Sequence, residues 1–322
     1  MIAVVHLVWG PLGVRPVREF VASYREHPAG AEHNLVLLLN AADDELRPAL
    51  AAELEGVEHR LLELDEPVQD LVAYAQAAAR LEHERLCFLN SYSLLLAPDW
   101  LAKLSHALDQ PGAGLVGATG SWASLHSGVL SSLLLPSPYR GVLPKRKVMR
   151  EEFYALEVER ERGVYESANS GPAPRRSPAR SVVNTLKAFH TIPEQILRFQ
   201  GFPNHHLRTN AFMAERATFA SLEIGEVQRK MDAYLLESGR RGLTRQIERR
   251  GLRPLVVDRD GEIYEQRRWA ESRTLWQGAQ EGLLVSDNQT GTYARGGIDR
   301  RRVLSAFAWG RQADPTPPGG SP

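Results

Sequence analysis

The feature that most constrains this chain is a regular alternation of short apolar runs with amphipathic segments over its first 118 residues. The apolar runs are too short for independent helices and nearly continuous, as strands buried on both faces are. They span residues 2–9, 34–39, 57–64, 85–89 and 114–118. The segments between them carry apolar residues at helical spacing, such as Val17, Phe20 and Val21, and we expect further helices over 67–81 and 99–108.

Strands that alternate with helices at this spacing predict an α/β fold, with a mostly parallel central sheet and helices on both faces. Such sheets bind their ligands at the carboxyl ends of the strands. The pattern stops near residue 125 and returns at 216–250 and 252–258. We therefore expect a binding half at 1–124, an irregular insertion or lid at 125–200, a second half with a C-terminal extension at 201–312 and a disordered tail at 313–322. Within the insertion, 163–180 is rich in Gly, Ser, Pro and Arg, which favours a mobile lid.

Composition narrows the class of protein. Lys plus Arg and Asp plus Glu are 39 each, so the formal charge of zero disfavours nucleic acid as a partner. A single cysteine, Cys87, allows no intrachain disulfide and fits a cytoplasmic, reducing location. The apolar start lacks the basic region of a signal peptide, and no apolar stretch is long enough to span a membrane. The oligomeric state stays open.

The sequence carries few of the short motifs that identify common nucleotide-binding proteins and hydrolases. A GxGxxG match at 112–117 precedes a strand instead of following one, which favours a turn over a dinucleotide site. No phosphate-binding GxxxxGK[ST], HExxH or GxSxG motif occurs. The neighbours His205 and His206 should point differently, so that one of them at most is a metal ligand or phosphate contact. Arg80 ends a predicted helix, where it either contacts a bound anion or complements the helix dipole.

A polar cluster, Asn90-Ser91-Tyr92-Ser93, follows the apolar run 85–89, and Pro98-Asp99-Trp100-Leu101 then opens a helix. This order resembles the centre of family 2-like glycosyltransferases with the nucleotide-sugar-binding GT-A fold. In those enzymes an Asp-x-Asp at the cluster holds a divalent cation, Mg²⁺ or Mn²⁺, against the donor diphosphate. The resemblance implies donor contacts by Asn90, Ser91 and Ser93. Because the cluster has no carboxylate, we expect a weaker dependence on metal.

The segment from Lys230 to Arg240 resembles the acidic Glu-Asp segment of the same family. The resemblance implies that Glu237 lies at the entry of a helix and is the catalytic base, with Asp232 in reserve. Alternatively, Glu237 is only a charge at the N-terminal end of that helix, which the helix dipole favours. The segments 207–213 and 117–122 resemble the acceptor side, which implies Trp122, Arg208 and Asn210 there. The remaining expected donor contacts are Trp9 and Asn40 at the nucleoside end and Arg80, His205 and His206 at the leaving group.

The sequence thus predicts a glycosyltransferase of hexosyltransferase type, in bacterial-type polysaccharide or glycoconjugate synthesis. It would move a sugar from a nucleoside-diphosphate sugar to an acceptor hydroxyl with inversion. Inverting transfer needs a base, stabilisation of the departing diphosphate and exclusion of water. Two alternatives remain: a catalytically inactive nucleotide-sugar-binding or scaffold protein on the same fold, which the missing Asp-x-Asp favours, and a nucleotidyltransferase. The resemblance to the glycosyltransferase family implies no role for the stretch 284–290.

Overall fold

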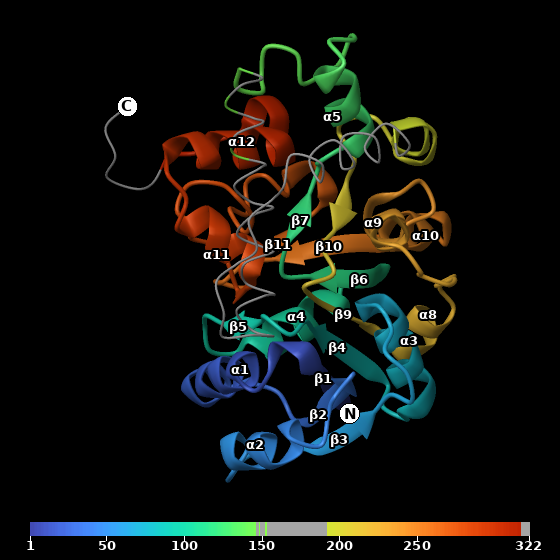
Figure 1. The fold of residues 1–322 in the computed structure, drawn as a ribbon, viewed down its shortest axis with the longest axis vertical. Coiled ribbons are helices and arrows are strands. Elements are labelled where there is room, and N and C mark those ends of the chain that lie inside the picture. The colour runs from blue at the N-terminus through green and yellow to red at the C-terminus, as the bar shows by residue number, and fades with distance from the viewer. Residues whose placement is uncertain (146–147, 149–151, 153–191, 317–322) are drawn as a thin grey trace.

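A central sheet of eight strands organises the chain, which is known from a computed structural model that describes residues 1–145, 148, 152 and 192–316 (Figure 1). The strands, in order across the sheet, are β11 (Ile263–Tyr264), β10 (Arg253–Val257), β6 (Ala113–Gly117), β9 (Ala211–Glu215), β4 (Arg85–Leu89), β1 (Ile2–Trp9), β2 (His33–Asn40) and β3 (Arg60–Glu63). Only β9 and β11 pair antiparallel to their neighbours in this sheet. The predicted mostly parallel α/β sheet is confirmed.

Helices cover both faces of the sheet, as predicted. The α-helices that lie wholly within the described residues are α1 (Arg15–Glu26), α2 (Leu46–Glu53), α3 (Asp70–Arg80), α4 (Trp100–Leu108), α5 (Leu125–Ser132), α8 (Arg216–Ala220), α9 (Lys230–Ser238), α10 (Leu243–Arg249), α11 (Asn288–Ala294) and α12 (Ile298–Trp309). Short 3₁₀ helices span Gly10–Leu12, Gln266–Arg268 and Gly310–Gln312. Helices α1, α2 and α4 share one apolar core with the sheet, whereas α3, α8 and α10 share the core on the other face.

Several predicted boundaries shift for local reasons. The strand predicted at 57–64 pairs only over β3, and the helix predicted at 67–81 starts at Asp70. Gly112 has a φ of 74° and turns the chain into β6, so the GxGxxG match is a turn before a strand. The pattern over 216–250 resolves into α8, α9 and α10. The predicted lid at 163–180 lies outside the described residues.

The C-terminal extension returns to the centre of the molecule. Its strand β12 (Val285–Ser286) pairs antiparallel with β5 (Leu94–Leu95), which follows the polar cluster after β4. A second small ladder joins β7 (Gly120–Ser121) to β8 (His206–Leu207). Because β12 pairs with β5, the extension helps to build the edge of the sheet at which ligands of such folds bind.

Among the described residues, no helix is long and apolar enough to cross a membrane.

Candidate active site

The carboxyl ends of β1, β2 and β4 meet at one edge of the sheet, where β9 begins. Trp9 ends β1, and its backbone nitrogen donates a hydrogen bond of 3.3 Å to the hydroxyl of Ser91, which follows β4. Ser91 is buried, whereas Trp9 is half-buried. The structure thus brings together two of the predicted donor contacts.

The polar cluster after β4 is a folded turn fastened to β9. The side-chain oxygen of Asn90 accepts hydrogen bonds from the Tyr92 nitrogen at 3.0 Å and from the Ser93 hydroxyl at 3.1 Å. The Asn90 nitrogen in turn donates to the carbonyl oxygen of Asn210 at 2.9 Å. Asx turns of this kind are local structure that any protein can use. The side-chain oxygen and the backbone nitrogen of Asn90 are therefore already engaged by neighbouring groups of the protein.

The same cluster does not fit a divalent cation. Mg²⁺ and Mn²⁺ prefer carboxylate oxygens, and residues 90–93 offer none. The amide oxygen of Asn90 is already engaged in two hydrogen bonds. Over the part of the chain that the structure describes, no three His, Cys, Asp or Glu side chains are grouped so that they could hold a metal.

Two other residues that were predicted to contact the donor, Asn40 and Arg80, bind groups of the protein itself. Asn40 is fully buried at the end of β2, where its amide donates to the carbonyl of Val68 at 2.7 Å and accepts from the Val68 nitrogen at 3.1 Å. Its side chain thereby fixes the entry to α3. Arg80 donates to the carbonyl of Glu63 and pairs with Asp65, both at 2.8 Å. Both side chains stabilise the loop between β3 and α3.

Arg208 and Asn210 each keep a buried donor without a partner. The guanidinium of Arg208 pairs with Asp287 at 2.7 Å, and the side chains of the two are 8% and 1% exposed. Its other terminal nitrogen, Nη1, is buried and has no hydrogen-bond partner among the residues that the structure describes, and the same holds for Nδ2 of Asn210. The amide oxygen of Asn210 accepts from the Thr119 hydroxyl at 2.6 Å, which fixes the direction of the amide. Buried polar groups are nearly always paired, so these two nitrogens call for an acceptor.

Asp287 is a site residue that sequence analysis missed. One of its carboxylate oxygens caps α11 by accepting from the backbone nitrogens of Gln289 and Thr290, and the other pairs with Arg208. Aspartate three residues before a hydroxyl residue is a capping signal that the sequence carries. Nothing in the sequence, however, shows that this cap lies against Arg208. The Asp287 and Glu237 carboxylates raise the pKa of Arg208, although burial alone would lower it.

Glu237 lies in the last turn of α9 and not at the entry of a helix, so the expected placement was wrong. Gly239 and Gly242 explain the break: a side chain on either would meet backbone atoms of α9 at less than 3 Å, and α10 starts anew at Leu243. One Glu237 oxygen, Oε2, accepts from the hydroxyl and the backbone nitrogen of Thr209 at 2.7 and 3.3 Å. The structure thus brings Glu237 to the segment that carries Arg208 and Asn210.

The two neighbouring histidines have different surroundings, as predicted. The ring of His206 is buried, with Nδ1 2.7 Å from the Asn204 carbonyl oxygen. Burial lowers its pKa, which the nearby Glu237 carboxylate opposes. His205 instead packs edge-on against Trp122, with ring centroids 5.4 Å apart. Burial, and then the charge of Arg245, lower its pKa to about 4.

Two more predicted site residues, Trp122 and Asp232, have structural partners, whereas Asp70, which was not predicted, interacts with Glu237. Trp122 is buried, and its indole donates to the carbonyl of Gln266 at 3.0 Å. Asp232 closes a capping box at the start of α9, where its bonds to Arg229 lower its pKa. Asp70, in the first turn of α3, interacts electrostatically with Glu237; partial loss of hydration and then this carboxylate raise its pKa.

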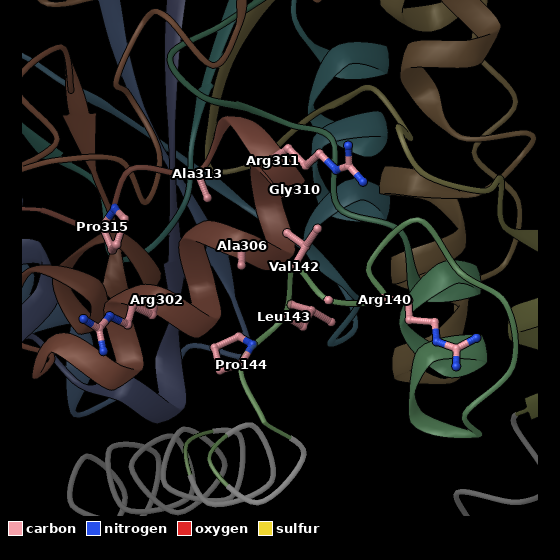
Figure 2. A pocket seen from close by; sticks show the side chains of 11 residues that line it. Arg140, Val142, Leu143, Pro144, Arg302, Ala306, Gly310, Arg311, Ala313 and Pro315 are labelled. Atoms are coloured by element: carbon pink, nitrogen blue, oxygen red, sulfur yellow. The ribbon is translucent and has the colours of Figure 1, made fainter.

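A cavity of about 780 Å³ lies away from this edge, between residues 140–144 and the end of α12 (Figure 2). Three arginines, Arg140, Arg302 and Arg311, line it. Their guanidinium groups point in different directions in Figure 2, so they do not converge on one anion.

No protein-family model and no curated protein matches the chain. Solved structures match in part. One of S. aureus TarS is 12% identical with a TM-score of 0.30, and the match covers 36% of this chain and about a third, 34%, of that one. The mannosyltransferase PcManGT from Pyrobaculum calidifontis, in complex with GDP-Man and Mn2+, is 13% identical with a TM-score of 0.31, over 61% and 84% of the two chains. Glucosyl-3-phosphoglycerate synthase from Mycobacterium tuberculosis is 12% identical with a TM-score of 0.33, over 67% and 57%. Likeness this low assigns no activity.

Proposed function

We propose that this chain binds a nucleoside-diphosphate sugar at the carboxyl edge of its sheet and transfers the sugar to an acceptor hydroxyl with inversion. The observation that carries the proposal is a pair of buried donors that find no partner in the described part of the chain, Nη1 of Arg208 and Nδ2 of Asn210. A buried donor left unpaired costs free energy that a bound acceptor would recover. A phosphate group offers charged oxygens, and a guanidinium is its best-matched partner among side chains.

Glu237 is the base in this proposal. Its Oε2 is held by Thr209, whereas its Oε1 has no hydrogen-bond partner among the described residues and can accept a proton. As the acceptor oxygen attacks the anomeric carbon, the hydroxyl proton passes to Glu237. The bond from that carbon to the phosphate oxygen breaks, and the oxygen leaves with the electron pair. Arg208 and Asn210 would stabilise the charge that develops there.

The same site also fits binding without turnover. The cluster at 90–93 has no carboxylate, and the side-chain oxygen of Asn90 is engaged by Tyr92 and Ser93. A protein that retains the diphosphate contacts of Arg208 but lacks catalysis would be a nucleotide-sugar-binding or scaffold protein. The two functions differ in one measurable product, the free nucleoside diphosphate that only transfer or hydrolysis releases.

Calorimetry with the full chain tests the site. We expect UDP or GDP, alone or as the sugar, to bind with and without a chelator. Asn210→Asp keeps the acceptor for Thr119 but replaces the free donor by a carboxylate, which should weaken binding about 10- to 100-fold. Asn34→Asp makes the same change at an exposed position at the start of β2 and should leave binding unchanged. No binding of either nucleotide at millimolar concentration, or equal binding by Asn210→Asp, would refute the proposal.

A further inference from the structure

Three consecutive leucines project into solvent at the end of α5. Leu133, Leu134 and Leu135 are 40%, 73% and 46% exposed. Figure 1 places α5 and the chain after it at one end of the long axis of the molecule, opposite β3 and α2. Single exposed leucines are common on protein surfaces, but a contiguous apolar tip marks an interaction surface.

The backbone at this tip is also unfavourable for the residue it carries. Leu134 has a φ of 61°, in the left-handed region that favours glycine. Its nitrogen donates to the Ser131 carbonyl at 3.1 Å, and the Leu135 nitrogen donates to the Leu130 carbonyl at 2.9 Å, which is the usual end of a helix closed by glycine. Glycine at position 134 would therefore avoid both the backbone strain and the exposure of an apolar side chain to water. Leucine at this position lowers the stability of the folded protein for both reasons.

The tip is held in place by the residues that follow it. The Ser137 hydroxyl donates to the Ser127 carbonyl at 2.8 Å, and the buried Tyr139 donates to the Phe307 carbonyl at 2.6 Å. The ring of Tyr139 also packs against Phe202, with centroids 4.8 Å apart. The leucines are thus presented outward by an anchored turn, and the fold does not tuck them into its core.

The segment that carries the tip is positively charged. The sequence from 125 to 145 contains no Asp or Glu, and both Arg140 and Lys145 are exposed. Arg311 is exposed too and lines the same cavity as Arg140 (Figure 2). Among the described residues, no carboxylate pairs with any of these three cations. Exposed apolar side chains, on a segment that carries cations and no carboxylate, match the chemistry of an anionic membrane surface.

We propose that this tip docks the protein on an anionic lipid bilayer, with the three leucines inserted below the headgroups. A projecting tip suits lipid, which adapts to it, better than a protein partner, which would need a shaped pocket. The proposal describes attachment to one leaflet and not a membrane span. It is independent of the proposed transfer, since none of its residues belongs to the sheet edge.

Vesicle flotation with the purified full chain tests the docking. We expect binding to phosphatidylcholine vesicles that contain phosphatidylglycerol, and much less to phosphatidylcholine alone. The combined variant Leu133→Gln, Leu134→Gly and Leu135→Gln should lower the partition coefficient at least about tenfold. Arg140→Gln should lower it about fivefold on anionic vesicles.

Two controls separate docking from damage to the fold. Leu134→Gly alone relieves the left-handed leucine, so it should weaken vesicle binding while the melting temperature stays equal or rises. Leu61→Gln removes a 43% exposed leucine from β3, at the far end of the molecule, and should bind like the wild type. Failure of the wild type to bind, or equal binding by the combined variant, would overturn the proposal. So would leucine-dependent self-association without vesicle binding, which would assign the tip to a second copy of the chain.

Discussion

His6 gives the sharpest test of the physical reasoning, because its imidazole is buried and no described residue offers it a hydrogen bond. It lies fully buried in the middle of β1, and neither ring nitrogen has a hydrogen bond to any part of the chain that the structure describes. Its ring stacks on Phe20, with centroids 3.9 Å apart. Burial penalises the charged form and lowers the pKa of His6 from 6.5 to about 3.

The size of the effect follows from proton linkage. The unfolded chain binds a proton at His6 near pH 6.5, whereas the folded chain does so only near pH 3. The contribution of the neutral ring is therefore fully present above pH 6.5 and is lost as the pH falls towards 3. One pKa unit corresponds to about 1.4 kcal/mol, so at about pH 5 the protein should lose roughly 2 kcal/mol of its free energy of unfolding through this residue alone.

Urea unfolding of the wild type and of His6→Leu at about pH 7 and about pH 5 measures this loss. Other groups also titrate in this range, so the informative quantity is the difference between the two proteins. His6→Leu should lose about 2 kcal/mol less than the wild type on acidification. His59→Leu changes an exposed histidine and should behave as the wild type does. Equal losses in the wild type and His6→Leu would refute the account of His6 as a buried neutral base.

Three further predictions concern the site. Glu237→Gln should lower turnover about 10²- to 10⁴-fold with little change in donor affinity, measured by product release and calorimetry; turnover within a few-fold of the wild type would contradict the role of base. Asp232→Asn should leave turnover within a few-fold and cost the α9 cap at most about 1 kcal/mol of unfolding free energy; an inactive but folded variant would transfer the base to Asp232. Asp287→Ala leaves the buried Arg208 without its counter-charge, so urea unfolding should show a loss of about 3–5 kcal/mol; a loss below about 1 kcal/mol would contradict the burial of the pair.

The sheet was largely predictable, because a strand that is buried on both faces needs apolar residues at nearly every position. The five predicted runs appear as β1, β2, β3, β4 and β6, and the helices between them follow the 3.6-residue period. The boundaries of helices and strands depend on single glycines and capping residues. In a sequence these signals are weaker than the repeating pattern of apolar residues. The break between α9 and α10 at Gly239 and Gly242 is such a case, and it moved Glu237 from a helix entry to a helix end.

The partners of the site residues could not be predicted in the same way. Arg208 and Asp287 are 79 residues apart, and nothing in a chain with 39 basic and 39 acidic residues singles out that pair. Arg80 shows the converse: its place at the end of α3 was predicted correctly, yet the guanidinium is engaged by Glu63 and Asp65. Local pattern determines where a charge lies along an element, whereas the tertiary fold determines which charge it meets.

The edge of the sheet is assembled from four distant segments, each of which is unremarkable by itself. Residues 90–93 form an Asx turn, Asp287 caps a helix, Glu237 accepts two bonds from Thr209 and Arg208 pairs with an aspartate. Within these four segments and Asn210, the described residues leave two buried donors without a partner, Nη1 of Arg208 and Nδ2 of Asn210. One oxygen of Glu237 also has no hydrogen bond among the described residues. Two buried donors next to an available base match an anionic leaving group next to a hydroxyl to be deprotonated. A site of this kind is recognised only by the polar atoms that are left without a partner when the other contacts of these residues have been assigned.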